Sequence, residues 1–197
     1  WSAVRTGGPY VVDSTAPDDT GLLFVSTYGN GQLRRYKVDG SGSSLVATGG
    51  GGVRGVAIDP VNWKVYWAGV VSPGTTIHRY SMDGSSPEPL VSAIVSVHSV
   101  ELDRTGGKMY WTDSGAGTLR RANLDGTSQE TLATGQAGPG GLSLDLPAGR
   151  IYWVNRGSGE LKRSNLDGSG QSTILSGLGQ PHSVDIDPVA GKVYWSE

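Results

Sequence analysis

The sequence is short of several residue types that define common kinds of site. It has no cysteine and only three histidines among 197 residues, which excludes disulfides, thiolate metal sites and cysteine nucleophiles. No apolar run approaches the roughly 20 residues of a membrane-spanning helix, so membrane insertion is not expected. Only 17% of residues are charged, the net charge is −2 and the basic residues are scattered. Nucleic acid is therefore not an expected partner.

No stretch shows the 3.6-residue apolar period of an amphipathic helix, so the sequence predicts an all-β fold. Glycine is abundant, with 32 residues, but six Trp and eight Tyr recur at fixed places. Disordered chains lack this aromatic content. The length suffices for one compact domain with a hydrophobic core, and we expect residues 1–197 to form it.

An internal repeat is the main signal in the sequence. Four Tyr-Trp pairs begin at positions that differ by 44, 42 and 42 residues: Tyr66, Tyr110, Tyr152 and Tyr194. Two sets of aspartates keep the same spacing: Asp39, Asp83, Asp125 and Asp167, and Asp59, Asp103, Asp145 and Asp187. Arginine recurs at positions 35, 79, 121 and 163, and Leu22–Val25 is a degenerate further copy of the Tyr-Trp segment. Several markers with one period indicate a repeat architecture.

Each repeat is predicted to contain four short antiparallel strands. In the third repeat they span residues 97–103, 108–112, 118–122 and 130–134, which are rich in β-branched and aromatic residues. Glycine-containing turns, such as Asp125-Gly126, separate them. Four strands in about 40–45 residues describe a blade of a β-propeller. Radial stacking of blades buries the faces that one sheet leaves open.

The third repeat resembles the YWTD repeat, also called the low-density-lipoprotein-receptor class B repeat. The resemblance rests on Tyr110-Trp111-Thr112-Asp113, on Leu119 and Arg121, and on Leu124-Asp125-Gly126. The other repeats end this motif differently, with Ala68-Gly69, Val154-Asn155 and Ser196-Glu197. The resemblance implies a non-catalytic propeller that lies outside the cell and binds protein ligands, often over one face.

Propellers of this family usually have six blades, whereas the sequence favours five. First strands are predicted to begin near Tyr10, Val53, Val97, Pro139 and Pro181. The last repeat stops after its second strand, and we expect the amino-terminal segment Trp1–Thr6 to pair into that blade and close the ring. Six blades, completed by sequence outside this chain, are the alternative.

The candidate binding residues open the first strands. One equivalent position holds Tyr10, Arg54, His98, Gly140 and His182. In the resembling family this position lies near the mouth of the central channel. The two histidines could form a pH-sensitive site or bind an anion with Arg54, or these could be solvated strand ends. Two histidines without a converging carboxylate do not predict a metal site, and no cofactor is expected.

Trp63 breaks the repeat, because the last repeat has Gly191 at the equivalent place in its turn. An exposed indole there would contact a partner protein or stack on a sugar. Equivalent loops of small polar residues (72–75, 114–117 and 156–159) would supply several similar weak sites, as in a lectin. Oligomerisation is left open.

The recurring residues are predicted to be structural. The Trp of each Tyr-Trp pair is expected to pack between neighbouring blades, and Arg121 is expected to pair with Asp113. The histidines lack the context of a Ser-His-Asp triad. Acids at Asp13, Glu101 and Asp185 keep a metallohydrolase as a third reading. The sequence therefore favours a protein-binding propeller, with a carbohydrate-binding lectin as the alternative.

Overall fold

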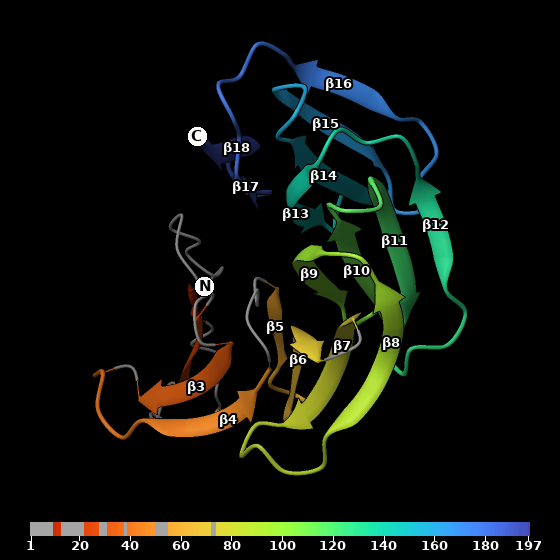
Figure 1. The fold of residues 1–197 in the computed structure, drawn as a ribbon. Coiled ribbons are helices and arrows are strands. Elements are labelled where there is room, and N and C mark those ends of the chain that lie inside the picture. Colours follow the sequence, from red (N-terminus) through yellow and green to blue (C-terminus); the bar gives the residue numbers. More distant parts are fainter. Residues whose placement is uncertain (1–9, 13–21, 28–30, 38, 50–54, 72–73) are drawn as a thin grey trace. The chain divides into compact units, whose positions relative to one another are not determined.

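The computed structural model describes residues 10–12, 22–27, 31–37, 39–49, 55–71 and 74–197. The chain divides into two compact units, residues 1–94 and 95–197. Each unit is built from antiparallel sheets that follow one another along the chain (Figure 1). The described residues form no helix, and so they contain no helix that could cross a membrane. The predicted all-β fold is confirmed.

The first unit contains two four-stranded sheets, each in sequential strand order. The first sheet consists of β1 (Tyr10–Val12), β2 (Leu22–Thr27), β3 (Gln32–Lys37) and β4 (Ser44–Thr48). The second consists of β5 (Val56–Asp59), β6 (Lys64–Val71), β7 (Gly74–Ser81) and β8 (Glu88–Ile94).

The second unit contains two further four-stranded sheets and a hairpin. One sheet consists of β9 (Val97–Asp103), β10 (Lys108–Asp113), β11 (Thr118–Asn123) and β12 (Glu130–Ala133). The next consists of β13 (Pro139–Asp145), β14 (Arg150–Asn155), β15 (Glu160–Asn165) and β16 (Ser172–Leu175). The hairpin joins β17 (Ser183–Asp187) to β18 (Lys192–Ser196).

The second strand of each complete sheet is buried on both faces. On β10, Met109 to Asp113 are all buried, although an antiparallel strand commonly exposes one face. The aromatic residues at this position explain the burial. Trp67 packs in one cluster with Phe24 and Leu33 of the preceding sheet, and Trp153 does the same with Leu119 of its preceding sheet. The predicted packing between neighbouring blades is confirmed for Trp67 and Trp153, whereas Trp195 is 42% exposed.

The first strands of the second unit lie next to one another. β13 contacts β9 on one side and β17 on the other. Gly141 N donates to the His182 carbonyl oxygen over 2.9 Å, which joins β13 to the segment that leads into β17. Residues that open these strands are therefore neighbours in space.

The strand positions agree with the predicted repeat. The first strands begin at Tyr10, Val97 and Pro139, as expected, while β17 begins at Ser183, two residues after Pro181. Val53 and the segment Trp1–Thr6 lie outside the described residues. The ring closure and the number of blades stay predictions.

Candidate binding site at the openings of the first strands

In the recurring Asp-Gly turns, the Asp carboxylate accepts hydrogen bonds from within the same turn. Asp167 Oδ1 accepts hydrogen bonds from Ser169 N at 2.9 Å and from Ser169 Oγ at 2.6 Å. Asp83 and Ser85 repeat this arrangement. The hydrogen bonds from Ser169, first from its side chain and then from its backbone, lower the pKa of Asp167. These aspartates hold turns between the third and fourth strands.

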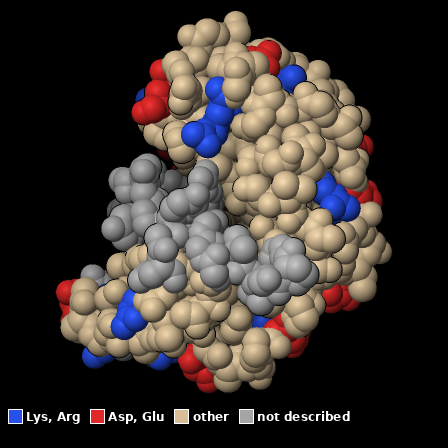
Figure 2. All heavy atoms as spheres, in the orientation of Figure 1, with Lys and Arg blue, Asp and Glu red and all other residues tan. Residues whose placement is uncertain are grey.

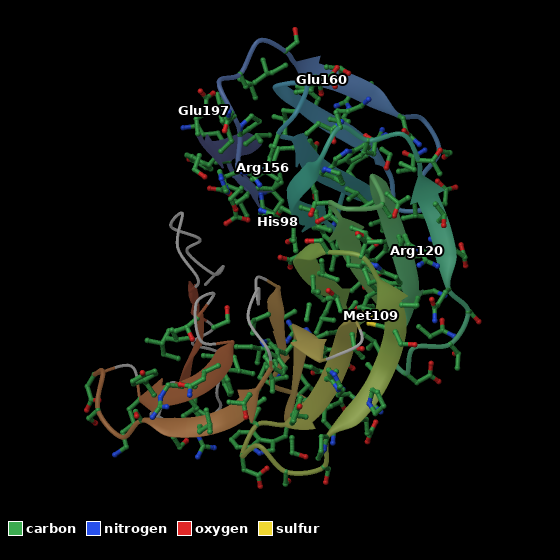
Figure 3. All side chains as sticks on the ribbon, in the orientation of Figure 1. His98, Met109, Arg120, Arg156, Glu160 and Glu197 are labelled. Carbon is green, nitrogen blue, oxygen red and sulfur yellow. The ribbon has the colours of Figure 1, made fainter. Side chains whose placement is uncertain are left out.

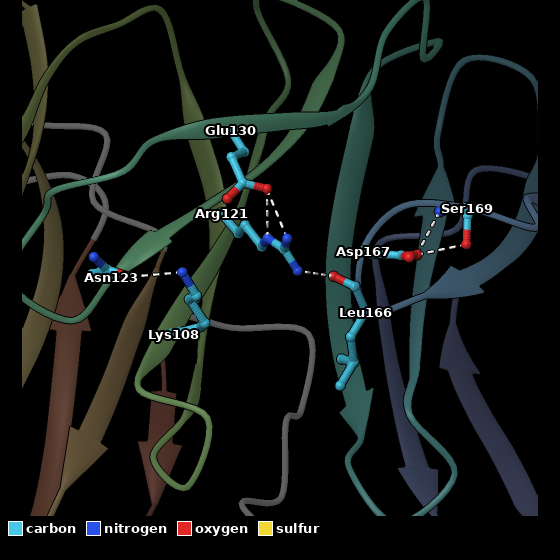
Figure 4. Close-up of polar contacts among 7 residues, drawn as sticks. All are labelled: Lys108, Arg121, Asn123, Glu130, Leu166, Asp167 and Ser169. Carbon is cyan, nitrogen blue, oxygen red and sulfur yellow. Dashed lines mark hydrogen bonds and ion pairs between the residues drawn. The ribbon is translucent and has the colours of Figure 1, made fainter.

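The recurring arginine joins successive sheets. Arg121 pairs with Glu130 across β11 and β12, at 2.7 Å between Nη2 and Oε2. Its Nη1 also donates to the carbonyl oxygen of Leu166, which precedes the Asp-Gly turn of the next sheet, at 2.9 Å (Figure 4). Arg35 makes the same contact with the Met82 carbonyl in the first unit. We refer to this contact as the arginine clasp.

The predicted pairing of Arg121 with Asp113 is wrong. The buried Asp113 carboxylate instead accepts four backbone N–H groups at 2.9–3.1 Å: Val95, Ser96, Gly115 and Ala116. Arg121 lies opposite Tyr110, three residues earlier on β10, and its guanidinium faces β12. The last residue of the motif therefore fixes two loops beside β10.

The histidines at the openings of the first strands come together. The ring centroids of His98 and His182 are 5.8 Å apart, with 49° between the ring planes. His98 lies on β9 and His182 precedes β17, so the strand between them is β13. The equivalent residue on β13 is Gly140, which has no side chain to separate the rings. His98 is partly buried and His182 is exposed.

Gly140 occupies a space that admits no side chain. A Cβ atom there would lie 2.9 Å from the His182 carbonyl oxygen and 3.0 Å from Val154 Cγ2. The Gly140 carbonyl accepts a buried 2.7 Å hydrogen bond from Thr112 Oγ1, which fixes this point of β13. The neighbouring backbones are thereby held at the separation that brings the imidazoles together.

The stem of Arg156 lies beside Gly140, close to the backbone of His182. Its Cγ lies 3.3 Å from the position that a Gly140 Cβ would take. Its Nε is buried and has no hydrogen-bond partner in the part of the chain that the structure describes. Figure 3 labels Arg156 and His98 near one another at the inner ends of the second unit's strands. We refer to His98, Arg156 and His182 as the cationic cluster.

Residues 107–145 match the family described as low-density lipoprotein receptor repeat class B. This segment runs from the turn before β10 to the end of β13 and includes both Arg121 and Asp113. A comparison with curated proteins finds no match.

Two solved structures show that the sheets are β-propeller blades. A chain of the crystal structure of the nidogen/laminin complex has a TM-score of 0.79 and 21% identity, over 89% of this chain and 67% of that chain. A structural genomics protein of unknown function from Bacteroides thetaiotaomicron VPI-5482 has a TM-score of 0.69 and 13% identity, over 100% and 66%. The chain thus spans about two thirds of their length. Because 740 chains match in structure, the fold alone does not select a function.

The other residues predicted for the mouth are not all described. Arg54 lies outside the described residues, as does the side chain of Tyr10, which begins β1. One acid of the first strands is already used within the fold, because Ser143 Oγ donates to Asp185 Oδ1 at 3.1 Å. Among the described residues, no group of three or more His, Cys, Asp or Glu could hold a metal ion.

Trp63 lies in the turn between β5 and β6 and is 44% exposed. Its φ is 55°, in the left-handed region, where three other repeats have Gly107, Gly149 and Gly191 at 63–66°. The Trp63 carbonyl accepts from Met82 N. Gly107 and Gly149 make the same bond to the next turn. The indole is therefore not required by the turn.

Sequence reasoning missed Arg156 and the role of Gly140. Both could have been noticed in the sequence, because each differs from the residues at the equivalent positions of other repeats. Arg156 stands where the two preceding repeats have Val70 and Ser114, and Gly140 stands between two histidines. Their consequence depended on knowing that β13 lies between β9 and β17 at close range.

Proposed function

We propose that this chain is a non-catalytic binding module that engages a protein ligand outside the cell through the openings of its first strands. The observation that carries the proposal is the approach of His98 and His182 to 5.8 Å across Gly140, with Arg156 beside them. These residues depart from the repeat, whereas the recurring Arg and Asp residues are occupied within the fold.

Two further observations support a protein partner. The class B match is to a repeat family whose propellers commonly bind proteins, and one similar structure is that of a nidogen/laminin complex. Figure 2 shows small, separate groups of Lys and Arg and of Asp and Glu among mainly uncharged residues on the described part of the visible face. Recognition would therefore depend on a local cluster rather than on a long-range field.

A binding screen tests the proposal. The purified chain and its His98→Ala/His182→Ala variant would be measured by biolayer interferometry against a panel of secreted and extracellular-matrix proteins. We expect at least one partner that the wild type binds with micromolar or tighter Kd and that the variant binds at least tenfold more weakly. A Gln129→Ala/Thr131→Ala variant, altered on exposed residues at the outer strand β12, should retain binding.

The comparison between the two double variants decides the site. If every partner bound both variants with the wild-type affinity, the openings of the first strands would not be the binding surface. Equal thermal unfolding of the three proteins would show that lost binding is not lost folding.

A carbohydrate-binding function is the second candidate, and Trp63 favours it. An exposed indole in a turn offers a flat apolar face of the kind that stacks on a sugar ring. A glycan array would test this function with the wild type and Trp63→Gly side by side. Binding of a glycan by the wild type alone would support the lectin reading, and no response to any glycan would remove it.

A further inference from the structure

We infer that the cationic cluster is a binding site for a carboxylate group on the protein ligand, supplied by an Asp or Glu side chain or by a chain carboxyl terminus. This inference rests on the proposed function and names the chemistry that the same site would recognise. The three residues of this site, His98, Arg156 and His182, all lie within residues 95–197.

The separation of the imidazoles suits one small acceptor. Hydrogen bonds to a charged oxygen are about 2.7–2.9 Å long, so one carboxylate oxygen, or the two oxygens of one carboxylate, span rings whose centroids are 5.8 Å apart. Gly140 allows the His182 backbone and the Arg156 stem to lie close to β13, and a bond from Gly141 N fixes the His182 carbonyl there.

Arg156 supplies the donor geometry that a carboxylate needs. A guanidinium presents a planar fork of N–H groups that matches two carboxylate oxygens. Among the described residues, none accepts a hydrogen bond from the buried Nε of Arg156. Arg79 pairs with Glu88 and Arg121 pairs with Glu130, whereas no acid among the described residues is paired with Arg156.

The charges of the cluster favour an anion over a cation. Arginine is permanently charged, and histidine becomes charged below its ordinary pKa of about 6.5. The acids nearest along the first strands are Glu101 and Asp185, each three residues beyond its histidine, and Asp185 already accepts from Ser143. The charge of Arg156 and the N–H groups that the two imidazoles can donate therefore suit an anion.

Imidazole NMR of the whole chain provides the test. The sequence has only three histidines, so single His98→Asn and His182→Asn variants would assign their ring signals. Burial lowers the pKa of His78, which lies beside Trp67 and serves as an internal reference. At pH 6.0 and constant ionic strength, the chain would be titrated with sodium acetate and, separately, with sodium chloride and sodium phosphate.

We expect saturable shifts of the His98 and His182 signals with acetate, no saturation with chloride and weaker binding of phosphate. Arg156→Gln should weaken acetate binding at least tenfold. Arg163→Gln, the same change at an exposed residue on β15, should leave it unchanged. A linear response identical for acetate and chloride would overturn the inference, as would phosphate binding tighter than acetate or an unaltered response in Arg156→Gln.

The protein partner is tested separately with any ligand from the binding screen. Replacing its contacting Asp or Glu by Asn or Gln should weaken binding by the same factor as Arg156→Gln. If a partner binds at the openings of the first strands but acetate does not saturate, the carboxylate inference fails while the proposed function stands. If acetate saturates but no partner is found, the proposed function fails and the anion site remains.

Discussion

Arg121 and Leu166 are 45 residues apart in the sequence, yet Nη1 of the arginine donates a 2.9 Å hydrogen bond to the leucine carbonyl. This contact binds the third sheet to the turn of the fourth, and its counterpart from Arg35 to Met82 binds the first sheet to the turn of the second. The recurring arginine of the repeat therefore helps to hold neighbouring blades together.

The clasp predicts that Arg121→Met destabilises the chain by about 2 kcal/mol. Methionine keeps the apolar stem but removes the bonds to Glu130 and Leu166, and the buried Tyr110 loses its interaction with the guanidinium. Urea unfolding followed by circular dichroism measures the change. Arg163→Met is the matched control, because Arg163 contacts only Ser172 Oγ among the described residues, at 3.4 Å. A similar loss in both variants would contradict a special role for the clasp.

The Asp-Gly turns predict an acid-dependent loss of stability. The pKa of Asp167 is lowered in the folded state, chiefly by the side-chain hydrogen bond from Ser169. Its contribution is therefore complete above the ordinary value of 3.8 and is lost as pH falls through the lowered pKa. Below that ordinary value, the Tm of the wild type should fall more steeply than that of Asp167→Asn. Parallel Tm curves would refute the contribution of this turn, which is small because the carboxylate is exposed.

Gly140→Ala is expected to destabilise the chain by about 1–3 kcal/mol, because the added Cβ would press on the His182 carbonyl oxygen. It should also move the histidines apart and weaken binding at the cationic cluster. Denaturant unfolding and imidazole NMR measure the two effects. Gly179→Ala is the control, since its Cβ would meet only the flexible end of Glu197 at 3.0 Å. Equal stability of both variants would mean that the approach of the two strands is loose.

Trp63→Gly is expected to leave stability unchanged or to raise it by up to about 1 kcal/mol. A non-glycine residue at a φ of 55° is strained, and glycine relieves that strain while adding freedom to the unfolded chain. Thermal unfolding checks this expectation. A loss above about 1 kcal/mol would show that the indole contributes to the fold, and it would then not be a free contact surface for a sugar or a protein.

Much of the fold could be predicted because the repeat marks its own strands. The Tyr-Trp pairs located the buried second strands, and the Asp-Gly pairs located the turns. The interaction partners of charged side chains were harder to predict. Asp113 and Arg121 are opposite in charge and close in sequence, yet Asp113 accepts from backbone N–H groups and Arg121 pairs with Glu130. Charge alone does not reveal which groups face each other across strands.

The candidate site was predicted only in part for a similar reason. The repeat alignment placed His98 and His182 at equivalent positions but on strands separated by another. Their approach depends on a residue without a side chain, Gly140, and on how closely β13 and β17 pack. Trp63 was identified from the sequence because it breaks the repeat, and its exposure is confirmed.

The arginine clasp also bears on how such a chain can lengthen. In both contacts the donor and the acceptor occupy equivalent places in consecutive copies, so duplicating or deleting one whole module of about 42 residues would keep such donors and acceptors in phase. A deletion that ended in the middle of a module would leave a donor or an acceptor without its hydrogen-bond partner. Gene rearrangements that preserve the phase of the copies are thus the ones this architecture tolerates.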